Sequence, residues 1–368
     1  MNLSELTTLR VGGPASELLA PGSAADLIET TLRVWATGDD WLVLGGGSNV
    51  VVADGGFGGS VIRVVTRGIE RLESEAGTVR LLVQAGEPWD GVVANAVDHG
   101  WAGIETLSGI PGSSGASPIQ NIGAYGQELS SSLIAIEFLD YETGELHRLL
   151  AEELELAYRT SALKQGRQGV VVSIELLLAE NAGALSNPIA YPQLATALGA
   201  KLGDRLPLAD VRRAVLALRA GKGMLLDPAD PDSVSAGSFF TNPIVSAAFA
   251  RGLPADAPRW PVESIERAPL ISDLETYRPE QLPARPSAED DRVKLSAAWL
   301  IERAGITRGF RLPGSGAAVS SKHTLALVNA GGATAAEIAE LARYLQARVV
   351  NAFGVILQPE PVLVGVHL

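Results

Sequence analysis

The chain has 368 residues, of which 46% are hydrophobic, enough for a large core and for two or three domains. Its formal net charge of −13 comes with no basic run, which makes nucleic acid and anionic membranes poor partners. Because the chain has no cysteine, it can form no disulfide, thiolate metal site, cysteinyl flavin link or cysteine nucleophile, in agreement with a reducing compartment.

We expect a cytoplasmic, soluble protein. The N-terminus lacks the basic and apolar regions of a signal peptide, and no apolar run reaches the roughly 18 residues of a spanning helix. The four histidines stand far apart without ligand spacing, so no metal site is expected.

The first hundred residues alternate between predicted strands and helices. A Ser-x-x-Asp capping pattern opens an amphipathic helix over 23–35, and a second helix is predicted over 88–98, with a proline in its first turn. Apolar segments predict strands at 41–44, 50–53, 60–65 and 78–85.

The turn between the first two strands reads LGGGSN, from Leu44 to Asn49. A Rossmann fingerprint would need G-x-G-x-x-G leading into a helix, but position 50 is valine. No G-x-x-x-x-G-K-[ST] pattern occurs either, which argues against a P-loop nucleotide hydrolase.

A longer glycine-rich stretch, IETLSGIPGSSGASPIQNIGAYGQE, runs from Ile104 to Glu128. Glycine lets a backbone approach a ligand closely, and free N–H groups bind phosphate oxygens, so one interpretation is a cofactor cradle. The other is a long surface loop. The second glycine-rich stretch, at 45–49, favours the cradle.

The rest of the chain continues the mixed pattern. A hairpin is predicted from 133–141 and 145–150, a buried strand at 169–179, a helix at 208–219 and a loop at 221–243. Within that loop, AGSFFTNP is interpreted on its residues alone as an ordinary strand with Phe239 or Phe240 in the core. Residues 251–292 are rich in Pro, Asp and Glu and predict an exposed insertion. Helices are predicted over 293–304 and 334–353, and a last strand over 355–366 is interrupted by QPEP, which contains Glu360.

Seven of these motifs, in this order, resemble the UDP-N-acetylenolpyruvoylglucosamine reductase (MurB) family: GGGSN, IPGSSGASPIQNIGAYG, YRTSALK, AGSFFTNP, KLSAAWLIERAG, HTLALVN and LQPEP. The resemblance covers nearly the whole chain. It implies an α+β fold, with a PCMH or vanillyl-alcohol-oxidase-type FAD-binding domain of two subdomains and a separate α+β substrate-binding domain. The implied segments are 1–67 and 68–206 for the two subdomains, 207–353 for the substrate domain with its acidic, proline-rich insertion at about 251–292, and 354–368 for a C-terminal strand that returns to the flavin domain.

The resemblance also implies the site residues. The family's catalytic arginine, proton-donating serine and glutamate match Arg159, Ser238 and Glu360. Non-covalent FAD is expected against Gly45, Gly46, Gly47, Ser48, Asn49, Ile110, Gly112, Ser113, Ser114, Ser117, Ile119, Ile122 and Gly123. Substrate contacts are expected from Tyr158, Tyr191, Asn242 and His323.

The implied reaction is the NADPH-dependent reduction of UDP-N-acetylglucosamine enolpyruvate to UDP-N-acetylmuramate, in peptidoglycan precursor synthesis. Flavin N5 would supply a hydride, Arg159 and Glu360 would stabilise the enolate, and Ser238 would supply the proton. Many members have a lysine near the position of Met224 that contacts substrate phosphate, so here this contact shifts to Lys222 or to another residue.

The residues alone leave two other functions open. One is a flavin oxidase or dehydrogenase of the same fold class, although an oxidase has no need of a serine that protonates carbon. The other is a UDP-sugar or flavin-binding protein without activity. A monomer is the favoured oligomeric state.

Overall fold

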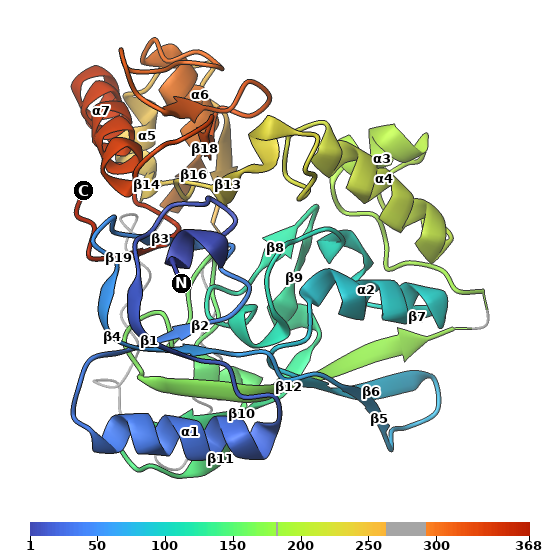
Figure 1. Cartoon of the computed structure of the whole chain (residues 1–368). Helices are drawn as coiled ribbons and strands as arrows, with labels where there is room; N and C mark the ends of the chain where they lie inside the picture. Colours follow the sequence, from blue (N-terminus) through green and yellow to red (C-terminus); the bar gives the residue numbers. More distant parts are fainter. Residues whose placement is uncertain (182, 263–291) are drawn as a thin grey trace, which may run out of the picture.

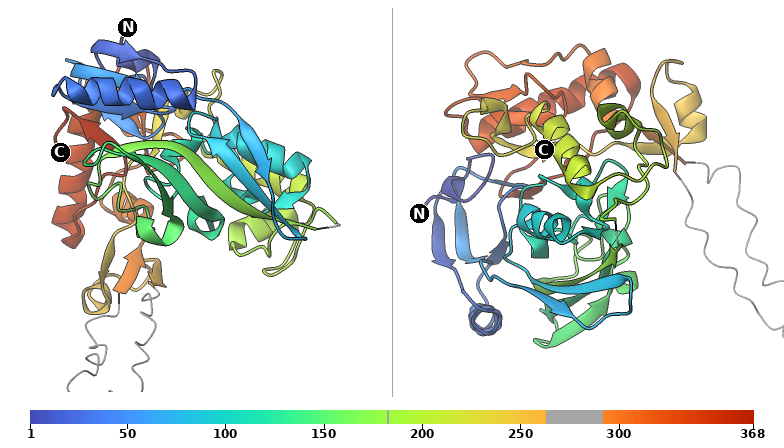
Figure 2. Two further views of the ribbon diagram at one scale, coloured as in Figure 1. Left: turned by 90° about the horizontal axis from the view of Figure 1, so that it is seen from below. Right: turned by 90° about the vertical axis from the view of Figure 1, so that its right-hand side faces the viewer.

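The computed structural model describes residues 1–181, 183–262 and 292–368, and it shows strands and helices in separate layers rather than in strict alternation (Figure 1). Two packed units lie side by side, one built mostly from the first 220 residues and one mostly from the rest (Figure 2). Within the described ranges, no helix is long and apolar enough to cross a membrane.

A parallel three-stranded sheet with the order β1-β4-β2 forms the start of the chain. Helix α1 connects β1 to β2, with Ser23 as N-cap because its side chain accepts a hydrogen bond from the N–H of Asp26. The bounds are β1 Ala15–Leu19, α1 Ala24–Ala36, β2 Trp41–Leu44, β3 Val50–Val52 and β4 Phe57–Arg63.

A larger sheet follows, with the antiparallel order β11-β10-β12-β6-β5 and with β7 paired to the end of β12. Apolar residues of this sheet pack against α2, whose Trp89, Val92 and Val93 are buried. The bounds are β5 Ile69–Leu72, β6 Thr78–Gln84, α2 Trp89–Asp98, β7 Trp101–Ala102, β8 Gly123–Ala124, β9 Gln127–Glu128, β10 Leu133–Asp140, β11 Leu146–Leu150 and β12 Gly169–Glu180.

Two helices, α3 and α4, share a small apolar cluster of their own and connect the large sheet to the C-terminal unit. That unit contains two three-stranded sheets, β13-β18-β17 and β14-β16-β15, packed with α5, α6 and α7. The bounds are α3 Pro192–Leu198, α4 Leu208–Ala220, β13 Ser235–Ser238, β14 Ile244–Ser246, α5 Ala247–Arg251, β15 Arg259–Pro261, β16 Arg292–Leu295, α6 Ala297–Arg303, β17 Ala317–Val319, β18 Ala326–Asn329, α7 Ala335–Phe353 and β19 Val362–Val364.

The two units are tied together by segments that cross between them. Strand β19 leaves the C-terminal unit and pairs in parallel with β3, Val362 opposite Val50. Conversely, three residues from the N-terminal part of the chain belong to the apolar core of the C-terminal unit: Leu9, Val11 and Val51. The start and the end of the described chain are therefore packed against each other.

Several elements predicted from local patterns are confirmed. The helix predicted over 334–353 has the expected capping box, Thr334 with Glu337, and ends at Gly354 with a φ of 68°. Phe239 and Phe240 are both buried, as predicted, although β13 ends before them, at Ser238. The second helix is confirmed with a small shift, because Pro88 is the N-cap residue and α2 starts at Trp89.

Two predictions need correction. Residues 293–295 lie in strand β16, not in a helix; α6 begins after Ser296, whose side chain caps it. Residues 355–357 are not strand, because Val355 and Leu357 pack in the core of the C-terminal unit without strand pairing, and β19 begins only after QPEP. Within the predicted loop 221–243, β13 is the strand predicted at AGSFFTNP. Residues 251–262 of the predicted insertion are mostly exposed, as predicted, and β15 there pairs with β16; residues 263–291 lie outside the described part.

Candidate active site

The two glycine-rich stretches meet face to face. A Cβ on Gly46 would lie 2.6 Å from the Cα of Gly112, and Gly112 itself has a φ of +121°, which other residues rarely adopt. The hydroxyl of Ser48 donates a hydrogen bond to the carbonyl of Pro111 at 2.9 Å, and this bond fixes the two loops to each other. Glycine is therefore needed here because one backbone passes against another.

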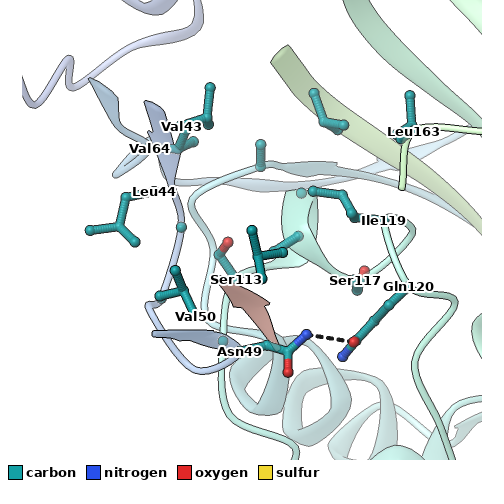
Figure 3. Close-up of a pocket in the computed structure, with 18 of the residues that line it drawn as sticks. Val43, Leu44, Asn49, Val50, Val64, Ser113, Ser117, Ile119, Gln120 and Leu163 are labelled. Carbon is teal, nitrogen blue, oxygen red and sulfur yellow. Dashed lines mark hydrogen bonds between the residues drawn. The ribbon is translucent and has the colours of Figure 1, made fainter. Parts of the chain in front are cut away.

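A cavity of about 520 Å³ opens beside these loops (Figure 3). Most of the residues predicted to bind the cofactor line it: Gly45, Gly46, Gly47, Ser48, Asn49, Ile110, Gly112, Ser113, Ser117, Ile119 and Ile122. Ser114 and Gly123 do not. The hydroxyl of Ser114 donates to the carbonyl of Glu87, and the carbonyl of Gly123 accepts from Arg159.

The cavity wall is largely apolar, and most of its polar side chains come from the two glycine-rich loops and from the segment 164–168. Val43, Val64 and Leu163 lie on one side of the view in Figure 3, whereas Asn49 and Gln120 lie on the opposite side. The amide Nδ2 of Asn49 donates to Oε1 of Gln120 at 2.6 Å. Such a mostly apolar cavity with a few fixed polar groups is typical of a cofactor site.

Arg159 is held in an unusual backbone conformation. It stands with Tyr158 at the tip of a tight turn that is closed by mutual hydrogen bonds between Ala157 and Thr160, and its φ is 55°. Its Nη2 donates to the carbonyl of Gly123 at 2.6 Å, and its Nη1 donates to that of Asn121 at 3.2 Å. A non-glycine residue in this region is strained, so the surrounding contacts determine where the guanidinium lies.

Glu360 completes an ion pair with this guanidinium. Its Oε1 lies 3.3 Å from the Nε of Arg159, and the side chains are only 13% and 19% exposed, respectively. Burial raises the pKa of the Glu360 carboxyl above its ordinary value, while the charges of Arg159 and Lys164 act in the opposite direction. Neither member of the pair lines the cavity, but Asn49 and Lys164 in its wall both donate to the Glu360 carbonyl, at 3.3 and 3.2 Å.

Ser238 ends strand β13, opposite Ala326. The next residue, Phe239, accepts a hydrogen bond on its carbonyl from the N–H of Glu360 at 2.9 Å. Gly237, with a φ of +74°, lies in the irregular part of this pairing. The structure thus brings Ser238 next to the segment that carries Glu360.

The remaining predicted substrate residues divide between two places. Tyr191 is 42% exposed and packs edge-on against Tyr125, with ring centroids 5.7 Å apart. The ammonium of Lys222 lies 5.5 Å from the centroid of the Tyr125 ring. His323 lies within electrostatic range of Lys222, and burial together with this charge lowers the pKa of His323 to about 4.

Asn242 and Tyr158 form the second place. Oδ1 of Asn242 accepts a hydrogen bond from the N–H of Ala297 at 2.9 Å, so this side chain already fixes the start of α6. Burial raises the pKa of Tyr158, and the ammonium of Lys294 lies 4.6 Å from its ring centroid. These contacts connect the arginine turn to the C-terminal unit.

Sequence reasoning missed several groups around the site. Arg219 is partly buried, burial lowers its pKa, and its buried Nε has no hydrogen-bond partner among the described residues. Trp41, Gln120 and Lys164 line the cavity. Lys164 ends the motif YRTSALK and Gln120 lies inside the longer glycine-rich stretch, so the sequence motifs could have pointed to both. The predicted strand that contains Trp41 and the predicted helix that contains Arg219 have no feature that indicates a site.

The chain matches two family models and a series of known proteins. Residues 15–150 match an FAD binding domain, and residues 228–364 match the C-terminal domain of UDP-N-acetylenolpyruvoylglucosamine reductase. Proteins named UDP-N-acetylenolpyruvoylglucosamine reductase are 60% identical in Leifsonia xyli and 48% identical in Saccharopolyspora erythraea, covering 100% of this chain and 98% and 95% of those proteins. The crystal structure of UDP-N-acetylenolpyruvylglucosamine reductase (MurB) from Thermus caldophilus superposes with a TM-score of 0.63 at 25% identity, covering 99% of this chain and 97% of that one.

Proposed function

The chain belongs to the UDP-N-acetylenolpyruvoylglucosamine reductase family, and on that premise we propose that Arg159, Glu360 and Ser238 carry its reaction. It is an FAD-dependent oxidoreductase that reduces UDP-N-acetylglucosamine enolpyruvate with NADPH, a step of peptidoglycan synthesis. We assign residues 1–67 and 68–206 to the two FAD subdomains, 207–353 to substrate binding and 354–368 to the returning strand.

The cavity suits FAD. Backbone N–H groups of 45–49 and 112–113 would hold the pyrophosphate, because only glycines allow the two loops to approach as closely as Gly46 and Gly112 do. Ile110, Ile119 and Ile122 offer apolar surface for the ring. When bound, FAD supplies the hydride that it receives from NADPH. FAD cannot be linked covalently through a cysteine, because the chain has no cysteine.

Arg159 stabilises the negative charge that develops on the substrate carboxylate when a hydride reaches the neighbouring double bond. Its guanidinium is already fixed by two carbonyls and by Glu360, so little reorganisation is needed during the reaction. Glu360 orients this guanidinium through its Nε, whereas the two carbonyls bind its Nη1 and Nη2. The Arg159–Glu360 ion pair beside the glycine cradle is the observation that carries the proposal.

Ser238 then gives its proton to the carbon next to the one that received the hydride. A hydroxyl is a weak acid in water, so it needs neighbours that stabilise the alkoxide it becomes. The N–H of Glu360 binds the adjacent carbonyl of Phe239, which fixes the serine backbone relative to the ion pair. This link supports the assignment of Ser238 as proton donor.

The diphosphate of the substrate would bind to Lys222 and Arg219. Both cations are partly buried, Arg219 keeps an unused Nε among the described residues, and burial lowers the pKa of each. Tyr191 and Tyr125 would cover the nucleotide, and His323 borders the same region, whereas Asn242 lies beside Tyr158. Lys222 thereby takes the part of the lysine that many relatives carry near the position of Met224.

We further propose a cytoplasmic monomer, since NADPH and nucleotide-activated sugars are cytoplasmic metabolites and one chain supplies every proposed site residue. The reaction is tested anaerobically. The purified protein should show an oxidised flavin spectrum that NADPH bleaches and UDP-N-acetylglucosamine enolpyruvate restores. If only oxygen restored the spectrum, the substrate assignment would be wrong; if no flavin bound, the cradle assignment would fail.

A further inference from the structure

Lys164 stands in the cavity wall without a part in the reaction described so far. Its Nζ donates a hydrogen bond to the carbonyl of Glu360 at 3.2 Å. Its backbone is fixed as well: its N–H donates to Oγ of Ser161 at 3.1 Å, and this fully buried hydroxyl donates to the carbonyl of Ile119 at 2.6 Å. Ile119 is itself a lining residue, so Lys164 is anchored to the same wall that would contact the flavin.

The ammonium of Lys164 is not neutralised locally. Among the described residues it has one hydrogen-bond acceptor, the Glu360 carbonyl, and no carboxylate lies within 4.0 Å of it. Since an ammonium has three N–H donors, two are left for other partners. Burial and the charge of Arg159 lower the pKa of Lys164, while the carboxylate of Glu360 raises it. Keeping a cation at this position therefore costs folding free energy.

The cation lies where added negative charge would be stabilised. A hydride carries two electrons and one proton, so an acceptor that takes one gains a unit of negative charge. In a largely apolar cavity, a fixed positive charge stabilises that added charge more strongly than it would in water. Charges near the flavin ring are a recognised means by which a protein tunes this cofactor.

We propose that Lys164 raises the reduction potential of the bound flavin and, through the Glu360 carbonyl, couples the flavin cavity to the catalytic ion pair. The inference rests on the proposed function, because it takes the cavity as the flavin site. A lysine that only tethered Glu360 would slow the step with the UDP-sugar and would leave the flavin potential unchanged.

The test measures the midpoint potential of the bound flavin by anaerobic equilibration with a redox dye. Lys164→Met removes the charge with little change of volume, and Lys164→Arg keeps the charge. We expect Lys164→Met to lower the equilibrium constant for reduction at least tenfold, which is about 30 mV for a two-electron couple, and Lys164→Arg to stay much closer to the wild type. Lys294→Met is the matched control. Its ammonium lies over the Tyr158 ring and outside the cavity lining, so the potential should not move.

A potential in Lys164→Met equal to that of the wild type would overturn the inference. If Lys164→Met and Lys164→Gln both failed to retain flavin while Lys164→Arg retained it, the need for a charge facing the cofactor would be supported. Loss of flavin in all three would overturn the inference in favour of simple packing. The potential is measured without UDP-sugar, so it tests Lys164 independently of the substrate, which wild-type turnover of UDP-N-acetylglucosamine enolpyruvate tests separately.

Discussion

Asp54 caps helix α7 from the other unit of the protein. Its Oδ1 accepts a hydrogen bond from the N–H of Ala335 at 2.7 Å, and its Oδ2 accepts one from the N–H of Ala336 at 3.0 Å. Asp54 follows β3, whereas Ala335 is fully buried in the core of the C-terminal unit. A carboxylate at a helix N-terminus is favourable because the free N–H groups there carry partial positive charge.

Asp54→Ala should therefore destabilise the protein. Loss of both hydrogen bonds is expected to lower the free energy of unfolding by about 1–2 kcal/mol, the usual cost of removing a cap. The internal capping box of Thr334 and Glu337 remains, so α7 itself should persist. Urea unfolding followed by circular dichroism measures the effect, with Asp54→Asn as an intermediate variant that keeps one acceptor oxygen. An unchanged unfolding midpoint in Asp54→Ala would show that this cap does not stabilise the fold.

Gly46→Ala should weaken flavin binding. The added methyl would lie 2.6 Å from the Cα of Gly112, which is backbone and can move only if the cradle opens. Overpacking of this kind costs about 1–3 kcal/mol, so we expect FAD affinity to fall roughly tenfold or more at about 1.4 kcal/mol per factor of ten. Flavin titration followed by protein fluorescence gives the dissociation constant. Gly58→Ala is the control, because a Cβ there meets no atom within 4 Å; equal affinities in the two variants would contradict the role of Gly46.

Ser238→Ala should separate the two half-reactions. Reduction of the flavin by NADPH does not need the serine proton and should stay near the wild-type rate. Reoxidation by the UDP-sugar should slow by a factor of about 10²–10⁴, the range typical of lost general acid catalysis. Stopped-flow absorbance of the flavin follows each half-reaction alone. Fast reoxidation in this variant would remove Ser238 from the role of proton donor.

His323 should make stability depend on pH. Its pKa is lowered from 6.5 to about 4 in the folded protein, so between these values the unfolded chain takes up a proton that the folded chain does not. The free energy of unfolding should consequently fall as the pH falls through this window, by at most about 3 kcal/mol at 1.36 kcal/mol per pKa unit.

His323→Asn removes this dependence. Relative to the wild type, the variant should gain stability when the pH is changed from about 7 to about 5, as measured from urea unfolding midpoints at both pH values. A constant difference between the two proteins would mean that His323 titrates normally. Bound diphosphate should reduce the effect, because an anion offsets the charges of Lys222 and Arg308 that disfavour the imidazolium.

The sequence predicts best what is determined locally. The capping pattern at Ser23 and the capping box at Thr334 each specify a helix start within a few residues, and both helices are found. The glycine-rich stretches were recognisable from their glycine content, and both of them line the cavity. In KLSAAWLI, a strand pattern is followed directly by a helix pattern. The predicted helix was extended too far toward the N-terminus, and the residues before Ser296 form β16 instead.

The parts of the site that depend on long-range contacts could not be read from the sequence alone. Nothing near Glu360 indicates that its carboxylate meets Arg159, because that contact depends on β19 pairing with β3. Likewise, Trp41 in β2 and Val64 just after β4 lie in segments whose pattern is also typical of a plain core, yet both line the cavity. Motif resemblance supplied the three proposed catalytic residues and includes Lys164 in one of its motifs, but the place of Lys164 in the cavity wall and the partly buried Arg219 became visible only in three dimensions.

The pairing of β19 with β3 also bears on how the protein is made. In the described part of the chain, β3 has no other partner strand, although Val50, Val51 and Val52 are almost completely buried in the finished molecule. On the ribosome this apolar strand must wait, with its backbone groups unpaired, until residues 362–364 have been synthesised. The same late segment delivers Glu360. A nascent chain therefore gains its last strand pair and its catalytic glutamate in a single event, so a molecule that has not finished folding also lacks a complete active site.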